Sequence, residues 1–160
     1  MTTIYIPCAS RDLERAKRVR QWCRDIGLTI SHDWITALES EAGTPESELP
    51  RTVRLRHATD DLLGALAADI VWFLVPDKGT HTAGAWIEFG AAIGQLLLRA
   101  LEHPSQRPQL VICSRSEVGC DSIFLELGAD IITRSTTTQA DAVVLQRLVE
   151  EFVPKSATTR

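Results

Sequence analysis

Residues 69–75, DIVWFLV, form the stretch that decides the fold. One aspartate is followed by an uninterrupted apolar run that stops at Pro76. A short, continuous apolar run with β-branched and aromatic residues is typical of a strand buried on both faces of a parallel sheet. Because such a sheet needs crossover helices on both faces, we expect strands and helices to alternate along the rest of the chain.

The rest of the sequence alternates in this way. Further strands are predicted at 3–8, 28–34, 110–113 and 129–133, and helices at 11–26, 51–67, 84–102, 119–127 and 138–153. Ser10 is the predicted N-cap of the first helix and Gly27 its end. Residues 35–50, with Gly43, Pro45 and Pro50, are predicted to form a long polar excursion.

This order of elements predicts the α/β class. We expect a single flavodoxin-like, doubly wound domain over residues 1–153, with a five-stranded parallel sheet in the order 2-1-3-4-5. The last residues, 154–160, are expected to form a flexible tail.

The composition argues against several functions. The chain has 160 residues, of which 44% are hydrophobic and 24% charged, and its net charge is −4. We therefore expect one globular domain that binds neither nucleic acid nor an anionic membrane surface. The start, MTTIYIPC, lacks the basic and apolar regions of a signal peptide, and no apolar run reaches the ~20 residues of a membrane helix. A cytoplasmic location is predicted.

The cysteines show no metal-binding pattern. Cys8, Cys23, Cys113 and Cys120 form no CxxC pair, and no histidine lies at metal-ligand spacing from them. We expect reduced, mostly buried thiols, no metal and no cofactor. Cys8 is singled out as a possible substrate contact because it follows the first strand, in a loop near the predicted site.

That site is a crevice at the carboxyl ends of the first and third strands. The strand order reverses between these two strands, and ligands of such sheets bind beyond their carboxyl ends. The loops at this point are 8–12 and 76–85. Trp34 and His32 follow the second strand and are expected to wall the crevice, with Trp34 the stronger candidate.

One glutamate lies at the mouth of this crevice. Glu88 occurs in GAWIEFGAAIG (84–94), among apolar and small residues, with no basic residue nearer than Lys78 and Arg99. An acidic residue in the first turns of a helix could simply be stabilised by the helix dipole. A carboxylate without a cationic partner could equally be reserved for positive charge that develops on a substrate.

Two segments resemble a known family. The opening strand IYIPCAS (4–10) and the segment DDLLGALAADIVWFLVPDKGTHTAGAWIEFGAAIG (60–94) are similar to the nucleoside 2-deoxyribosyltransferase-like superfamily. That superfamily includes deoxyribosyltransferases and nucleoside-monophosphate N-glycosidases. The resemblance implies that the chain acts on a nucleoside or nucleotide and forms a homo-oligomer, because sites shared between subunits are common in the family.

The resemblance also implies roles for single residues. Glu88 matches the nucleophile, Tyr5 the residue that orients it, and Asp61 a carboxylate that contacts the nucleobase. Asp77 matches a further base contact. Ser10 and Arg11 correspond to the first loop, which holds the 5′-phosphate in monophosphate-specific members.

The segment IYIPCASRDLERAKRVRQWCRDIGLTISHDW (4–34) also resembles a bacterial TIR domain. TIR domains place a catalytic glutamate shortly after a tryptophan, as Trp86 and Glu88 are placed here. This second resemblance implies an NAD hydrolase of bacterial defence signalling. A non-catalytic module that binds a nucleotide or another TIR-like domain is a third alternative. Tyr5 and Asp61 favour the deoxyribosyltransferase side.

Both enzymatic alternatives break an N-glycosidic bond of a ribose. The transition state resembles an oxocarbenium ion, which a carboxylate such as Glu88 can stabilise or attack. Trp86 and Phe89 are expected to exclude water from this carboxylate. Asp61 or Asp77 could give a proton to the departing base.

Overall fold

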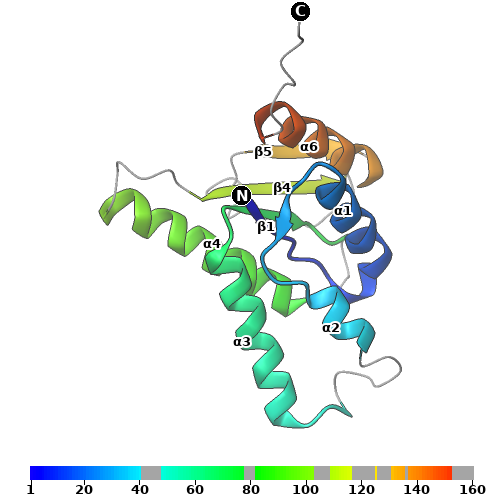
Figure 1. Cartoon of the computed structure of the whole chain (residues 1–160), viewed down its shortest axis with the longest axis vertical. Coiled ribbons are helices and arrows are strands. Elements are labelled where there is room, and N and C mark those ends of the chain that lie inside the picture. Colours follow the sequence, from blue (N-terminus) through cyan, green and yellow to red (C-terminus); the bar gives the residue numbers. More distant parts are fainter. Residues whose placement is uncertain are drawn as a thin grey trace, which may run out of the picture.

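The computed structural model of the chain describes residues 1–40, 48–77, 82–102, 109–116, 125, 131–135 and 137–152, with the backbone alone at 131–135 and 137. Its centre is a parallel sheet made of β1 (Thr3–Tyr5), β2 (Thr29–Ile30), β3 (Ile70–Leu74), β4 (Leu110–Ser116) and β5 (Ile131–Ser135). The strands lie in the order β2-β1-β3-β4-β5 (Figure 1). The predicted α/β class with a parallel sheet is confirmed.

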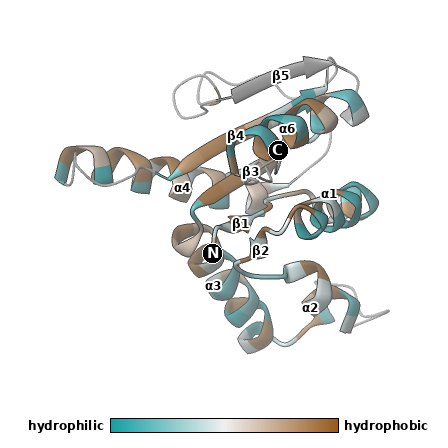
Figure 2. Ribbon diagram, turned by 45° about the horizontal axis from the view of Figure 1, so that its top comes forward, coloured by the Kyte–Doolittle hydropathy of each residue, from teal (hydrophilic) through white to brown (hydrophobic). Residues whose placement is uncertain are grey.

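Helices cover both faces of the sheet. α1 (Leu13–Asp25) and α6 (Thr137–Phe152) pack on one face, and α3 (Arg51–Ala67) and α4 (Ala83–Glu102) pack on the other. Each face has its own buried apolar cluster. Figure 2 shows hydrophobic colouring along β3 and β4, as expected for central strands that are covered on both sides.

The alternation of side chains along each strand divides these two clusters. In β3, Trp72 faces the α1 and α6 side, whereas Val71 and Phe73 face the α3 and α4 side. In β1, Ile4 joins the first cluster and Tyr5 joins the second. The period of the strand therefore places Tyr5 under α3 and α4.

The segment after α1 differs from the prediction. β2 is only Thr29–Ile30, so the predicted strand 28–34 is wrong beyond it, because the chain turns and begins α2 (Trp34–Ser40). Asp33 stabilises this start: Oδ1 accepts a hydrogen bond from the Thr36 N–H at 3.2 Å. The predicted excursion 35–50 thus contains a helix, and 41–47 lies outside the described residues.

The start of α1 also differs. A 3₁₀ turn, η1 (Ser10–Asp12), precedes α1, and neither helix has a hydrogen bond from a capping side chain. Ser10 is therefore not the N-cap that the sequence predicts. The predicted end is confirmed: Gly27 has a φ of 83° and its N–H donates to the Arg24 carbonyl at 3.0 Å.

The first half of α3 projects away from the sheet (Figure 1). Leu55, in this first half, is 51% exposed. The second half packs tightly, since Gly64 and Ala65 are buried. This geometry leaves the middle of α3 free to wall a cavity.

A buried ion pair connects the helices and strands of the other face. Arg15 donates to both carboxylate oxygens of Asp141, at 2.9 Å from Nε and 2.8 Å from Nη2. Its other donors reach the carbonyls of Val75 and Ser114 at 3.0 and 3.1 Å. One guanidinium therefore joins α1, α6, β4 and the end of β3.

Some predictions lie outside the described residues. These are the helix around 119–127 apart from Leu125, the tail 154–160, and Cys120. Among the helices that are described, none is long and apolar enough to cross a membrane.

Candidate active site

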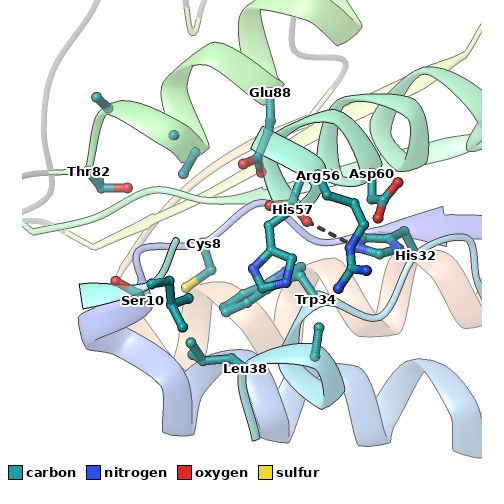
Figure 3. A pocket seen from close by; sticks show the side chains of 16 residues that line it. Cys8, Ser10, His32, Trp34, Leu38, Arg56, His57, Asp60, Thr82 and Glu88 are labelled. Atoms are coloured by element: carbon teal, nitrogen blue, oxygen red, sulfur yellow. Dashed lines mark ion pairs between the residues drawn. The ribbon is translucent and has the colours of Figure 1, made fainter. Parts of the chain in front are cut away.

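A cavity of about 720 Å³ lies at the carboxyl ends of β1 and β2, between α2, α3 and the start of α4 (Figure 3). This is within the size range of sites for small molecules. The side chains with polar groups on its wall are Cys8, Ser10, His32, Trp34, Arg56, His57, Asp60, Asp61, Thr82 and Glu88. The cavity adjoins the two predicted loops through Cys8, Ser10 and residues 82–85, but it lies on the β2 side of β1 and not between β1 and β3 as predicted, and helix α3 forms part of its wall.

Glu88 lines this cavity and is hydrogen-bonded to Tyr5, which lies buried behind it. The Tyr5 hydroxyl donates a hydrogen bond to Glu88 Oε2 at 3.1 Å. Tyr5 is fully buried, and its pKa is raised by burial and by the nearby charges of Glu88 and Asp61, so the phenol remains a donor. Among the described residues, no ion pair includes Glu88, and its hydrogen-bond partner is the neutral hydroxyl of Tyr5.

The surroundings of Glu88 make its carboxylate basic. The pKa of Glu88 is raised to about 7: burial raises it most, the charge of Asp61 also raises it, and the hydrogen bond from Tyr5 lowers it. A carboxylate that titrates near neutral pH, in a cavity, is typical of a functional site. Structural ion pairs can also shift pKa values, but none of the ion pairs in the described part of the chain includes Glu88.

Asp61 is the second carboxylate of the site. Burial raises its pKa, whereas His32, the hydrogen bond from Tyr5 and His57 lower it. His32 Nε2 lies 3.2 Å from Asp61 Oδ1. The phenol of Tyr5 therefore lies between two carboxylates, one on α3 and one on α4.

Gly64 allows α3 to approach closely enough for Asp61 to reach Tyr5 and His32. A Cβ on Gly64 would lie 2.4 Å from His32 Cβ and 3.2 Å from two ring atoms of Tyr5, so only glycine fits. The Ser31 hydroxyl donates to the Gly64 carbonyl at 2.9 Å, which joins α3 to the end of β2. Asp61 is one helical turn before Gly64 and is brought to Tyr5 and His32 by this contact.

Three further predicted residues lie on the cavity wall. Cys8 is buried, and burial raises the pKa of its thiol to about 12, so it is a neutral wall group and not a nucleophile. Trp34 is fixed by a hydrogen bond from its indole N–H to the Ile6 carbonyl at 3.0 Å. Ser10 is exposed at the rim.

The structure does not bring the other three predicted residues to the described wall. Arg11 is exposed in η1 and is absent from the lining. Asp77 is exposed and accepts a hydrogen bond from the Ser116 hydroxyl. Trp86 packs on Phe73, with ring centroids 4.8 Å apart. It is two positions before Glu88 in the helix, so the two side chains point to different sides of α4.

Sequence reasoning missed most of the α3 wall. Arg56, His57, Asp60 and Asp61 all line the cavity. Their spacing of one, four and five residues is that of a single helical face, so the helical period was the available signal. The close contact at Gly64 had a weaker signal, a glycine in the interior of a predicted helix.

The described residues contain no group of three His, Cys, Asp or Glu side chains that could hold a metal ion. The site itself offers the basic carboxylate of Glu88, the phenol of Tyr5 that orients it, and a second carboxylate, Asp61, beside His32. Such a set can stabilise a cation and exchange a proton with a ligand.

Comparisons with known proteins reveal a structural likeness. No family model and no curated protein matches the chain. Among solved structures, the 2-deoxyribosyltransferase of the psychrotolerant bacterium Bacillus psychrosaccharolyticus matches with a TM-score of 0.56 and 18% sequence identity, over 90% of this chain and 96% of that chain. At this identity the likeness shows a shared fold. The chemistry has to be argued from the cavity.

Proposed function

We propose that the protein cleaves or transfers the N-glycosidic bond of a nucleoside, deoxynucleoside or nucleoside monophosphate, with Glu88 as the nucleophile. One observation carries the proposal: a buried carboxylate in the cavity has a tyrosine hydroxyl as its partner and forms no ion pair with any described residue. The structural likeness to a 2-deoxyribosyltransferase supports membership of that superfamily, as does the sequence resemblance.

The proposed reaction begins with the ionised form of Glu88. A carboxylate oxygen approaches the anomeric carbon while the bond from that carbon to the base nitrogen breaks, and the bonding electrons leave with the base. The base takes a proton from the Asp61 side of the cavity. Water or a second base then displaces Glu88 from the sugar, which gives hydrolysis or transfer.

Tyr5 has an orienting role in this scheme. Its hydroxyl donates to one oxygen of Glu88, so the other oxygen, Oε1, is available to the sugar. The phenol also weakens the repulsion between Glu88 and Asp61, because it can donate toward either carboxylate.

A product assay tests the proposal. The purified protein is incubated with separate pools of nucleosides, nucleoside monophosphates and NAD, and free base is measured by chromatography and mass spectrometry. The Glu88→Gln variant should release less than about 1% of the wild-type product, since a nucleophile is removed. Glu102→Gln, the same change at an exposed position of the same helix, is the matched control.

The remaining outcomes separate the alternatives. Nicotinamide release from NAD alone would replace the nucleoside proposal by the TIR-type NAD hydrolase, which rests on the sequence pattern only. If no pool gives free base while a nucleotide raises the melting temperature, the non-catalytic binding module would stand. Full activity of Glu88→Gln would contradict the assignment of the nucleophile.

A further inference from the structure

The strongest feature that the proposed mechanism does not yet use is the pair formed by His32 and Asp61. His32 Nε2 lies 3.2 Å from Asp61 Oδ1, and both side chains line the cavity (dashed line in Figure 3). Each is mostly buried yet open to the cavity, with 28% of the His32 side chain and 23% of the Asp61 side chain exposed. The pair can therefore reach a ligand without being fully solvated.

The surrounding fold holds the pair rigidly. His32 Cβ touches α3 at Gly64, the residue one turn after Asp61. The neighbouring Ser31 hydroxyl bonds the Gly64 carbonyl at 2.9 Å, so the backbone on both sides of the pair is fixed. At 3.2 Å, Nε2 of His32 is near enough to exchange a proton with Asp61, whose buried Oδ1 accepts no hydrogen bond from the described residues.

The charges around the pair give it a distinct role. Glu88 on α4 faces Asp61 across the phenol of Tyr5 on β1. Arg56, His57 and Asp60 face the cavity from α3, and the neutral thiol of Cys8 faces it from the loop after β1.

Ionising both carboxylates is unfavourable, because the charge of Asp61 raises the pKa of Glu88, and a cation or proton beside one of them relieves this repulsion. His32 contacts Asp61 and not Glu88, so the cation or proton is placed on the Asp61 side. Two carboxyl groups with opposed environments are how one site keeps a nucleophile ionised and an acid protonated.

We propose that His32 is the proton-supplying partner of Asp61, and that the two residues act as one unit that protonates the departing base. The step rests on the proposed function. The proton on Asp61 bonds to the base nitrogen as the bond between that nitrogen and the anomeric carbon breaks. That proton is the single one shared by the pair: it comes from the imidazolium of His32 through Nε2, and its loss leaves neutral His32 beside ionised Asp61 until water protonates the imidazole again.

The test compares two leaving groups. Wild type, His32→Gln, Asp61→Asn and Glu88→Gln are assayed with the substrate found in the product assay and with 4-nitrophenyl 2-deoxyriboside, whose phenolate leaves without a proton. We expect His32→Gln to lower kcat on the natural substrate about 100-fold, the lower range for a lost proton transfer, and to leave the nitrophenyl reaction within about threefold. Glu88→Gln should abolish both reactions.

A second measurement does not depend on the artificial substrate. If the two residues act as one unit, the double variant His32→Gln with Asp61→Asn should be no slower on the natural substrate than Asp61→Asn alone. If the activity losses of the two single variants multiply in the double variant, the proposal that His32 and Asp61 act as one unit is wrong. His32→Asn, which also keeps the Cβ that meets Gly64, replaces His32→Gln if the latter unfolds at a lower temperature than wild type.

The two proposals fail in different ways. Equal losses of His32→Gln on both leaving groups, or no loss on either, would overturn the role of His32 while Glu88→Gln remained inactive. A wild-type protein that releases neither base nor nitrophenolate would overturn the proposed function itself.

Discussion

Glu88 is the central residue of the site, and its surroundings disfavour the ionised carboxylate. Its pKa is raised to about 7 by burial and by Asp61, so at neutral pH only part of the protein carries the ionised carboxylate. The ionised form is the nucleophile of the proposed reaction. Tyr5 and Asp61, which shift the pKa of Glu88, therefore influence the reaction rate at a given pH.

This gives a pH prediction. We expect kcat/KM to rise with pH along a limb centred near 7, because protonated Glu88 cannot attack. Tyr5→Phe removes the hydrogen bond that lowers the pKa, so the limb should move to higher pH. Asp61→Asn removes a charge that raises it, so the limb should move to lower pH. Shifts of the two variants in the same direction would contradict this account.

Stability should depend on the same carboxylate. Its pKa in the folded protein lies above the ordinary value of 4.5, so the folded state binds the proton more tightly than the unfolded state. Stability is therefore lost as pH rises from about 4.5 to about 7. Glu88→Gln, which cannot ionise, should be more stable than wild type by about 3 kcal/mol at pH 8 and nearly equal to it at pH 4.

Urea unfolding at these two pH values measures the effect without any substrate. Glu102→Gln, which changes an exposed glutamate of the same helix, should change the stability little at either pH. A Glu88→Gln protein that is less stable at pH 8 would show that the carboxylate serves the fold and not the site.

Among the elements, α3 decides whether the site is assembled. Its approach to β1 and to the end of β2 depends on the missing side chain of Gly64, since an added Cβ would lie 2.4 Å from His32 Cβ. This Cβ contact is not at the end of a flexible side chain, so α3 itself has to move.

We expect Gly64→Ala to lower the free energy of unfolding by about 1–3 kcal/mol and to lower activity more than stability alone explains, because Asp61 moves with the helix. Gly90→Ala on α4 is the matched control. An added Cβ there meets no atom within 4 Å, so it should stabilise the helix by up to about 1 kcal/mol. Equal effects of the two substitutions would rule out the packing argument.

The elements also show what the sequence could predict. The apolar run of β3, the helical period of α1 and the turn at Gly27 are local signals, and the structure confirms them. The strand predicted at 28–34 was wrong because tertiary context ends β2 early. Asp33 caps α2 and forms ion pairs with Arg20 and Arg24. Local sequence patterns do not predict these ion pairs.

For the site, strand order was sufficient to place Glu88 at the crevice, whereas Tyr5 was predicted only through the family resemblance. The contact of His32 with Asp61 and the burial of Arg15 with Asp141 depend on how separate elements pack. The sequence contains the residues of such pairs but not their distances. Trp86 illustrates the limit. It is only two residues from Glu88 in the sequence, and for that reason it lies on another side of α4 and packs on Phe73.

Over the whole molecule, one helix face lacks a covering partner among the described residues. Ile87, Leu98 and Leu101 share a face of α4 and are 59%, 57% and 80% exposed. Apolar groups grouped in this way are typical of surfaces that bind another protein. The face belongs to the helix that carries Glu88, so a second copy bound there would lie close to the site.

We therefore expect the protein to be a homo-oligomer that uses this face of α4. Leu98→Glu should convert it to a monomer, because association would then bury a charge. Val143→Glu, at a 53% exposed apolar position of α6, is the control and should leave the oligomer intact. Light scattering coupled to size-exclusion chromatography measures both, and a monomeric wild type would contradict the expectation.

Tyr5 has one more consequence. It is the only tyrosine of the chain, and its hydroxyl rests on Glu88. Growth on tyrosine labelled with ¹³C at the ring carbon that bears the hydroxyl would therefore give a protein with a single tyrosine signal in its NMR spectrum. That signal would come from the hydrogen bond at the centre of the site. Protonation of the carboxylate, arrival of a ligand and formation of a sugar ester could each be followed at one frequency, without an introduced probe.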